Sequence, residues 1–426
     1  MNKQNFSSSK IKFKLYNSKL SIKLSGENFM RRFHIASDEE IKRGETTDIY
    51  FVRTKQVLEA KGLSKTHVVA EITPGELPGG LPWGIICGIE EVAKLFEDVP
   101  VNIYAFPEGS LFYYKDYYGV REPVLRIEGL YGEFCIYETP LLGMLCQASG
   151  IATRAARVKK AAGDKPIISF GIRRMHPALS PMIDRAAYIG GFDGVSSLTG
   201  AKAAGIKPVG TMPHALIIVF GDQVKAWKAF DEVMPEDVPR IALVDTYYDE
   251  KTEALMAAEA LKDRLFGVRL DTPGSRKGDF AEIVREVRWE LDIRGYKNVK
   301  IFVSGGLNEE KVRILSEAGA DAFGVGTYVS NAPTIDFAMD IVEIDGKICA
   351  KRGKLGGKKE VWRCPECLTD IVLPYNSAQP KCPKCGGKTE RMLKPLIENG
   401  KIVAELPKPK EIRSYVLKQL EKVELA

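Results

Sequence analysis

Three apolar runs separated by glycine and proline dominate the first third of the chain. They are THVVAEI from Thr66, VNIYAF from Val101 and VLRIEG from Val124. Each run is short, rich in β-branched residues and bounded by turn-forming residues, which is the pattern of a β-strand. We therefore predict an antiparallel sheet with helices on one face, and we assign residues 30–140 to an α+β sandwich domain.

A different rhythm begins near residue 141, where short apolar runs alternate with amphipathic helical segments. Seven runs follow this pattern: PIISF, GFDGVSS, KPVGTM, RIALVD, FGVRLD, VKIFVSGG and ADAFGVGT. Such alternation is typical of parallel β/α architectures. We expect an irregular β/α barrel over residues 141–345. Its candidate chemistry lies in the polar residues at the strand ends, because barrels place their active sites there.

The two ends of the chain differ from these domains. Residues 1–29 are rich in Ser, Lys and Asn, and we assign them to a basic N-terminal extension, with Met30 as a candidate start. Residues 346–426 open with the basic, glycine-rich stretch KRGKLGGKKE and close with a helical segment rich in Lys and Glu. A cysteine module lies between, so this segment is expected to form a small zinc ribbon followed by a helical tail.

Composition narrows the functions open to this chain. Its 62 basic and 56 acidic residues leave a net charge of +6. An excess this thin is weak evidence for nucleic-acid binding and fits an enzyme of phosphorylated small molecules at least as well. The chain shows no run of about 18 apolar residues and no signal-peptide pattern. The cysteines outside the module resemble reduced core thiols, so we expect a cytoplasmic protein without membrane or nucleic-acid partners.

Two CPxC pairs carry a strong metal signal. Cys364 and Cys367 are followed, after fourteen residues, by Cys382 and Cys385. Two such knuckles can present four thiolates to one tetrahedral ion. Four protein ligands leave no open position, so we expect a structural zinc that holds together a segment too short to fold alone. A redox disulfide is the alternative.

The first half of the expected barrel holds three further motifs. The stretch from Ser169 to Leu216 contains FGIRR, GVSS and GTMPH in this order. Here the chain resembles the nicotinate phosphoribosyltransferase family, whose members combine FGxRR, G-[VT]-S-[SN] and GTxxH runs. TTDIYFVRT, FGVRLD, VSGGL and FGVGT extend the resemblance over most of residues 45–330. It implies transfer of the ribose 5-phosphate unit of phosphoribosyl pyrophosphate to nicotinate, giving nicotinate mononucleotide, a precursor of NAD.

Glycine turns and arginines supply candidate anion ligands. Two turns at late strand ends would offer backbone N–H groups to a 5-phosphate, and they comprise Ser304, Gly305, Gly306, Gly324, Gly326 and Thr327. Arg173 and Arg174 follow the PIISF run, where planar guanidinium groups would grip a carboxylate or pyrophosphate. His176 lies near them and would serve the phosphates. Ordinary tight turns and solvated arginines are the alternatives, and the resemblance makes Arg173 the ligand contact.

The resemblance also implies how the pyridine ring is held. It places Phe170 on one face of the ring and Tyr50 on the other, with Tyr50 supplied by a second subunit, so the site would be completed in a homodimer. Ser196 and Ser197 stand where related nicotinamide-using enzymes have an aspartate. A carboxylate about 4 Å from that of nicotinate would cost on the order of 4 kcal/mol at an effective dielectric near 20. Serine therefore favours an acid over an amide.

Charged residues at later strand ends complete the expected site. Asp271, preceded by Arg269, resembles the family's aspartate that meets the ribose hydroxyls or the metal-bound diphosphate, and Asp245 is a weaker candidate. Mg²⁺ would neutralise the departing pyrophosphate. His214 holds the family position of a histidine that ATP phosphorylates, which implies ATP-coupled turnover. An exposed turn aspartate and a structural histidine are the alternatives.

Three other functions compete with this interpretation. A quinolinate phosphoribosyltransferase shares the architecture but binds two carboxylates, and the DTRKT-type run of that family is absent from this sequence. A nicotinamide-specific enzyme is disfavoured by Ser196. In a different class, the ribbon with its basic linker from Lys351 to Lys359 would suit an RNA-binding protein, although no aromatic residue other than Trp362 is interleaved with its basic residues.

Overall fold

The computed structural model describes residues 32–276 and 278–425. The chain divides into two units, Met1–Ser37 and Asp38–Ala426, and all helices and strands belong to the second. The expected extension over residues 1–29 and the candidate start Met30 lie outside the described residues.

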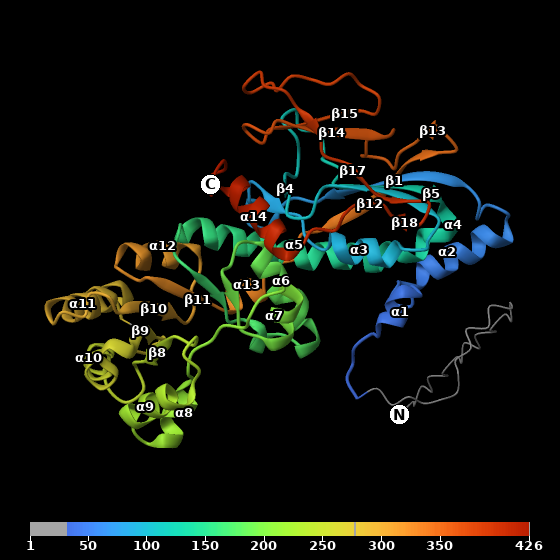
Figure 1. Cartoon of the computed structure of the whole chain (residues 1–426). Helices are drawn as coiled ribbons and strands as arrows, with labels where there is room; N and C mark the ends of the chain where they lie inside the picture. The colour runs from blue at the N-terminus through green and yellow to red at the C-terminus, as the bar shows by residue number, and fades with distance from the viewer. Residues whose placement is uncertain (1–31, 277, 426) are drawn as a thin grey trace, which may run out of the picture. The chain divides into compact units, whose positions relative to one another are not determined.

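A seven-stranded antiparallel sheet contains the three strands expected from the first third of the chain, and these are confirmed as β1, β3 and β5 (Figure 1). Its order is β13-β12-β1-β5-β3-β17-β18. Burial alternates along β3, as expected for a strand that presents one face to a core. The bounds are β1 (His67–Pro74), β3 (Val101–Ala105), β5 (Leu125–Leu130), β12 (Phe337–Ile344), β13 (Lys347–Ile348), β17 (Lys394–Glu398) and β18 (Lys401–Ile402), with the separate pair β2 (Gly84–Ile85) and β4 (Leu111–Phe112).

A six-stranded parallel sheet forms the second half of the fold. Its order is β7-β6-β11-β10-β9-β8, and since β7 and β8 are not paired, it is a curled half-barrel rather than a closed barrel. β8 and β11 are buried at every position, which is typical of parallel strands covered on both faces. The bounds are β6 (Ile167–Ser169), β7 (Gly194–Val195), β8 (Arg240–Leu243), β9 (Leu265–Leu270), β10 (Lys300–Ser304) and β11 (Ala322–Val325).

One of the seven predicted barrel strands does not form. The KPVGTM segment has no strand conformation, and Val209 makes a single backbone hydrogen bond to Val195. Pro208 cannot donate to a ladder, and Gly210 disfavours extended pairing, so the run leaves the sheet as a loop. The barrel prediction holds for the other six runs.

Helices cover both sheets, and the longest, α5 (Glu138–Ala162), packs against α3 on one side and against α6 and α12 on the other. A Cβ at Gly150 of α5 would lie 2.2 Å from the carbonyl oxygen of Pro333, so glycine lets the segment before β12 pass close to the helix. The other helices are α1 (Asp38–Lys42), α2 (Ile49–Ala60), α3 (Ile89–Phe96), α4 (Tyr131–Phe134), α6 (Ser180–Ile189), α7 (Leu198–Ala204), α8 (His214–Phe220), α9 (Gln223–Val233), α10 (Glu250–Leu261), α11 (Phe280–Ile293), α12 (Glu309–Glu317), α13 (Thr327–Ser330) and α14 (Pro409–Leu420).

The C-terminal segment returns to the earlier layers. β14 (Lys359–Arg363), β15 (Asp370–Pro374) and β16 (Glu390–Arg391) form the small sheet of the cysteine module. β17 then pairs with β3, and α14 packs on α5 and α6. β12 lies inside the expected barrel range but belongs to the first sheet. Our domain limits at residues 140 and 345 stay a prediction. The first sheet includes strands from beyond both limits, since β12, β13, β17 and β18 all belong to it.

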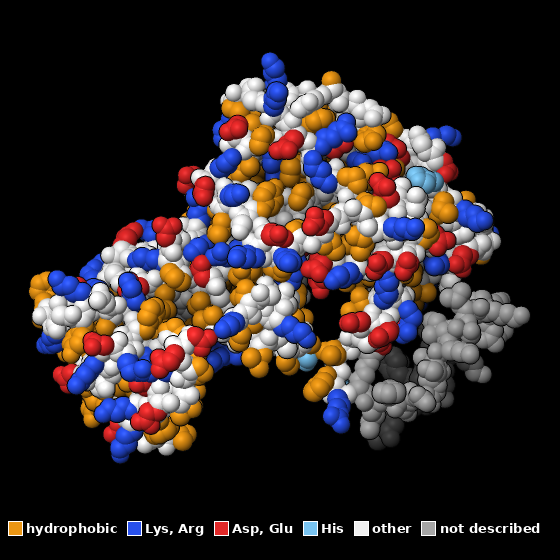
Figure 2. Space-filling model, in the orientation of Figure 1, with side chains coloured by type: hydrophobic (Ala, Val, Ile, Leu, Met, Phe, Trp, Pro, Cys, Tyr) orange, Lys and Arg blue, Asp and Glu red, His pale blue; other side chains and the backbone are white. Residues whose placement is uncertain are grey.

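On the face shown in Figure 2, basic and acidic side chains are interspersed, and no continuous basic surface forms among the residues coloured by type. The mixture of charges on this face agrees with the thin net charge of the sequence. None of the helices in the described part of the chain is both long and apolar enough to cross a membrane.

Candidate active site

The carboxyl ends of the half-barrel strands bring most of the predicted residues together. Asp245 follows β8, Asp271 follows β9, and Ser304 ends β10. These strands are neighbours in the sheet, so the three side chains meet at one edge although more than fifty residues of chain separate the first from the last. The seven apolar runs could locate such strand ends, but only the strand order shows which of them are adjacent.

Arg269 is the centre of a hydrogen-bond network at this edge. Its Nε donates to Ser304 Oγ at 3.0 Å, its Nη1 donates to Thr211 Oγ1 at 2.7 Å, and its Nη2 donates to Asp271 Oδ2 at 3.0 Å. Ser304 Oγ in turn donates to Asp271 Oδ1 at 2.7 Å. The guanidinium carbon also lies 5.2 Å from the centre of the Phe170 ring. Burial lowers the pKa of Arg269, while Asp271 opposes that shift.

His214 and Asp245 form a second, connected pair. His214 Nε2 donates to Asp245 Oδ1 at 2.8 Å, and the other carboxylate oxygen accepts the backbone N–H of Asp271 at 2.5 Å. The hydrogen bond to Asp245 raises the pKa of His214, and burial opposes it. The Asp245 side chain is 3% exposed and the His214 side chain is 35% exposed. The histidine ring is therefore accessible at the site, and the buried aspartate holds it through a hydrogen bond. The structure thus gives Asp245 a larger part than its sequence context indicated.

One glycine explains how Phe170 reaches this network, and another shapes the neighbouring turn. A Cβ at Gly324 would lie 2.3 Å from a carbon of the Phe170 ring, so only glycine leaves room for the ring beside β11. Gly306 has a φ of 68° with open space at its Cβ position, which fits a turn that exposes its backbone. Thr327 begins α13 directly after Gly326. These turns adjoin the network, and their role in phosphate binding stays a prediction.

Arg173 and Arg174 are exposed, in the 3-10 turn Ile172–Arg174 that follows β6. Neither makes an ion pair with another described residue, and the charge of Arg173 contributes to lowering the pKa of Arg269. The role of Arg173 as a ligand contact stays a prediction. His176 is exposed as well, but its Nδ1 accepts the backbone N–H of Ala178 at 3.2 Å.

The serine pair divides into two roles. Ser197 Oγ donates to Asp184 Oδ2 at 2.5 Å and accepts the backbone N–H of Gly200 at 2.9 Å, so it caps the start of α7. The Ser197 side chain is buried and engaged in these two bonds, and its expected contact with the substrate stays a prediction. Ser196 is only partly buried and remains the candidate for contact with a ring substituent.

Tyr50 is not brought to this edge within one chain. It lies on α2, is 55% exposed, and packs against the ring of Phe51 at 4.2 Å. The described contacts of α2 are with α4 and with the turn Cys135–Tyr137. An aromatic partner for Phe170 from the same chain is therefore not formed by Tyr50.

Three side chains of the network escaped the sequence reasoning. Thr211 binds Arg269, and Thr272 Oγ1 lies 3.3 Å from Asp245 Oδ2 and 2.5 Å from Glu250 Oε1. Thr211 is the threonine of the GTMPH motif and Thr272 follows Asp271 directly. Both therefore lie in or beside motifs that the sequence revealed, but a neutral side chain gave no reason to choose them as candidates. Glu250 opens α10 and had no sequence signal.

The four module cysteines form a group that could hold a metal ion, with their sulfur atoms within 4.8 Å of one another. Cys364 and Cys385 lie 3.4 Å apart, and Cys367 lies 3.5 Å from Cys382. A regular tetrahedron with metal–sulfur bonds of about 2.3 Å has sulfur atoms about 3.8 Å apart, so the observed spacing fits one tetrathiolate ion. The metal signal in the sequence is confirmed at this level.

Comparisons with known proteins agree with this geometry. Models of the quinolinate phosphoribosyl transferase N-terminal and C-terminal domains match residues 48–149 and 151–340. A nicotinate phosphoribosyltransferase of Mycobacterium tuberculosis is 30% identical over 360 residues, which cover 74% of this chain and 74% of the relative. The chain belongs to the nicotinate phosphoribosyltransferase family. The Bacillus subtilis nicotinate phosphoribosyltransferase is 28% identical and covers 71% of this chain and 67% of its own length.

Solved structures share the architecture. A nicotinate-nucleotide pyrophosphorylase from Pyrococcus furiosus is 60% identical, with a TM-score of 0.88, and covers 92% of this chain and 99% of its own. Human nicotinic acid phosphoribosyltransferase is 19% identical, with a TM-score of 0.70, and covers 89% of this chain and 94% of its own. At this identity it shows the fold alone. The family relatives and the pyrophosphorylase carry different names, so the acid that this chain uses has to be argued from its own site.

Proposed function

We propose that this protein transfers the 5-phosphoribosyl group of phosphoribosyl pyrophosphate to nicotinate, in the salvage of NAD. The observation that carries the proposal is the joined network of Arg269, Asp271 and His214 at the strand ends, in a chain of this family. It gathers an aspartate, an arginine and a histidine at one edge, where they would position the substrates and compensate the charge that develops during phosphoribosyl transfer.

The reaction would form one bond and break one bond at the ribose. The pyridine nitrogen of nicotinate attacks C1 of the ribose, and the C–O bond to pyrophosphate breaks, so that its electron pair leaves with pyrophosphate. The transition state has oxocarbenium character, and the protein positions the reactants and compensates charge. Phe170 would lie against the pyridine ring, Arg173 would bind an anionic group of the substrates, and the turns at Gly306 and Gly326 would hold the 5-phosphate.

The carboxylates of Asp245 and Asp271 suit a magnesium ion. Both are hard oxygen donors at neighbouring strand ends, which is the donor type that Mg²⁺ prefers. Both carboxylates accept hydrogen bonds on both oxygens, but the Asp271 side chain is 26% exposed whereas that of Asp245 is 3% exposed. Asp271 is therefore the residue that would hold the ion. Bound there, Mg²⁺ would neutralise the departing pyrophosphate.

His214 is the residue that would couple ATP to the reaction. Its Nε2–H is fixed by Asp245, which leaves the lone pair of Nδ1 directed away from the aspartate. Attack of Nδ1 on the γ-phosphoryl group of ATP would form an N–P bond and release ADP. The hydrogen bond to Asp245 favours the tautomer that this step needs, because a histidine whose Nδ1 carried the proton could not attack through Nδ1.

The cysteine group is proposed to bind zinc in a structural role. Its four sulfur ligands match the all-cysteine coordination that structural zinc sites prefer, and they leave no open position for a substrate. None of the four cysteines is bonded to a described residue of the network, which also argues against a part in the chemistry.

We propose further that the active form is a homodimer. Tyr50 is 55% exposed on α2, beside Ile49 at 60% and Val57 at 60%. This apolar helix face and the unpaired face of Phe170 fit the expected arrangement in which a second subunit supplies the other half of the ring pocket.

Quinolinate is the second candidate substrate. The observation that favours it is the 60% identical structure named a nicotinate-nucleotide pyrophosphorylase, together with the matching quinolinate phosphoribosyl transferase domain models. That reaction would release CO₂ from the second carboxylate.

The test is a product assay by chromatography. The purified chain receives phosphoribosyl pyrophosphate and Mg²⁺ with nicotinate, nicotinamide or quinolinate, each with and without ATP. Turnover of nicotinate alone is expected, with ATP raising its rate in wild type and leaving it unchanged in His214→Asn. Turnover of quinolinate alone, with release of CO₂, would overturn the assignment in favour of the second candidate.

A further inference from the structure

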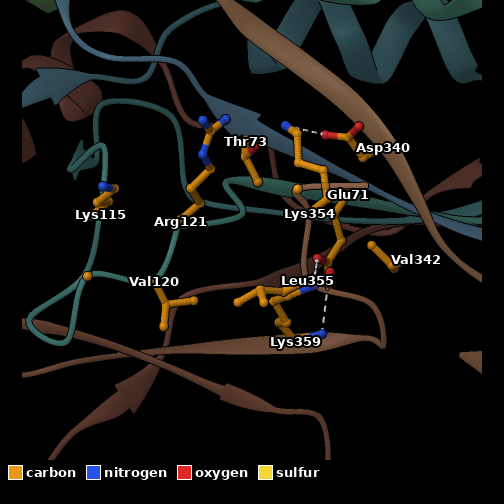
Figure 3. Close-up of a pocket in the computed structure, with 12 residues that line it drawn as sticks. Glu71, Thr73, Lys115, Val120, Arg121, Asp340, Val342, Lys354, Leu355 and Lys359 are labelled. Atoms are coloured by element: carbon orange, nitrogen blue, oxygen red, sulfur yellow. Dashed lines mark hydrogen bonds and ion pairs between the residues drawn. The ribbon is translucent and has the colours of Figure 1, made fainter. Parts of the chain in front are cut away.

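A second pocket lies in the first half of the fold, with a volume of about 230 Å³ (Figure 3). Its walls come from β1, from β12, from the loop that contains Lys115 and Arg121, and from the basic stretch at Gly353 to Lys359. No strand of the half-barrel lines it, so it is separate from the candidate active site.

The pocket has two cations without a carboxylate partner. Lys359 is paired with Glu71 at 2.8 Å, and Lys354 with Asp340 at 2.7 Å. Lys115 and Arg121 also line the pocket but form no ion pair with a described residue, and both lie over the ring of Tyr114, at 5.0 and 5.3 Å. The lining therefore carries two uncompensated positive charges, which favours a ligand with two negative charges.

The loop that carries these cations is held rigidly. Lys115 and Arg121 face each other across a backbone bridge at the base of the turn. Asp116, 7% exposed, accepts the backbone N–H groups of Val120 at 2.7 Å and of Val372 in the module sheet at 2.8 Å. The backbone that carries the two cations is thus ordered before a ligand arrives, which reduces the entropy lost on binding.

Thr73 supplies a hydroxyl group in the same pocket. Its Oγ1 is buried and has no hydrogen-bond partner, whereas buried hydroxyl groups are ordinarily bonded. Figure 3 shows Thr73 between the side chains of Arg121 and Lys354. A phosphate oxygen at this point would accept from the hydroxyl and from the guanidinium together. The apolar side chains of Val120 and Val342 line the remaining wall and suit an organic group beside the anion.

We propose that this pocket binds a phosphate-bearing small molecule at a site distinct from the active site. The shared chemistry is a phosphate group held by Arg121, Lys115 and Thr73. The ligand is either a free inorganic anion or the phosphate chain of a nucleotide, and the experiment separates these sources.

Hydrogen–deuterium exchange of the full chain gives a local readout that active-site binding does not produce. Inorganic phosphate, pyrophosphate, ATP and adenosine are added in turn, and exchange is followed in peptides covering residues 113–121 and 353–359. Protection by phosphate or pyrophosphate assigns an inorganic anion, and protection by ATP alone assigns a nucleotide. Protection by adenosine to the same extent as by ATP, or by none of the four, would overturn the proposal.

Variants link the protection to the named side chains. Arg121→Gln is expected to weaken binding about tenfold, the effect of losing one charge-assisted hydrogen bond. Arg121→Lys keeps the charge and should retain part of the binding, and Thr73→Val should weaken it without altering charge. Lys347→Gln removes an exposed cation of the same sheet, outside the pocket, and serves as the matched control. If Lys347→Gln weakened ligand binding as much as Arg121→Gln, the effect would come from general surface charge, and the assignment to this pocket would be refuted.

Discussion

Arg269 joins three partners through three different nitrogen atoms, and Arg269→Lys would keep its charge but remove this fork. The partners are Ser304, Thr211 and Asp271, at 3.0, 2.7 and 3.0 Å. A lysine ammonium carries its donors on one atom and cannot reach three groups in these directions. We expect the bond to Asp271 to survive and the two bonds to hydroxyl groups to be lost. Each contributes about 1 kcal/mol net, so the loss is about 2 kcal/mol.

If the network orients Asp271 toward the ribose, about 2 kcal/mol corresponds to a fall of about thirtyfold in kcat/KM. Steady-state assays with nicotinate measure this fall, and urea unfolding measures how much of the loss is stability instead. The matched control is Arg264→Lys, immediately before β9, because Arg264 pairs with Asp231 at 2.7 Å with its side chain 46% exposed. A surface pair contributes at most about 1 kcal/mol, so the control should leave kcat/KM unchanged. Wild-type kcat/KM in Arg269→Lys, at equal amounts of folded protein, would refute the reasoning.

Three further outcomes follow from the other charged groups. Asp245 raises the pKa of His214, so the stability that this pair contributes is present below the ordinary value of 6.5 and is lost as pH rises through the raised pKa. Asp245→Asn should remove that pH dependence of the urea midpoint, and an unchanged profile would contradict it. Burial raises the pKa of Glu138 to about 7, so its charge destabilises the fold as pH rises from 4.5 through that value. Glu138→Gln should therefore raise Tm at pH 8 and leave it unchanged at pH 4, as calorimetry can test. Cys367→Ser should lower both the bound zinc, measured by mass spectrometry, and Tm, while kcat per folded chain stays near wild type. A proportionate loss of kcat would place the metal in the chemistry.

Local sequence patterns were sufficient where burial is continuous. The runs RIALVD and ADAFGVGT contain β8 and β11, which are buried at every position, because short apolar stretches suit a parallel strand covered on both faces. The KPVGTM run shares the apolar character but contains Pro208 and Gly210, and it stayed a loop. The apolar runs alone therefore overestimated the number of strands by one. The backbone properties of Pro208 and Gly210 kept this run out of the sheet.

Long-range pairing was beyond the reach of those patterns. β17 pairs with β3 across almost three hundred residues, and β12 leaves the half-barrel to join β1. The same limit applies to the site. The hydrogen-bond partner of Ser197, Asp184, lies on α6, and nothing in the GVSS motif indicates it. Arg269 and Asp271 were found because charged residues at a strand end are conspicuous, whereas neutral Thr211 was not.

The cations that remain available at the site bear on the choice between nicotinate and quinolinate. Each nitrogen of Arg269 already donates one hydrogen bond within the chain, and its charge is paired with that of Asp271. Arg173 and Arg174 are the arginines beside the network that make no ion pair with a described residue. Phosphoribosyl pyrophosphate brings a pyrophosphate that needs one of them, even when backbone N–H groups hold its 5-phosphate. One cation is then left for the ring substituents, which matches the single carboxylate of nicotinate. The second carboxylate of quinolinate would enter the pocket of this chain without a counter-charge, and an unpaired charge in a partly buried site is strongly unfavourable.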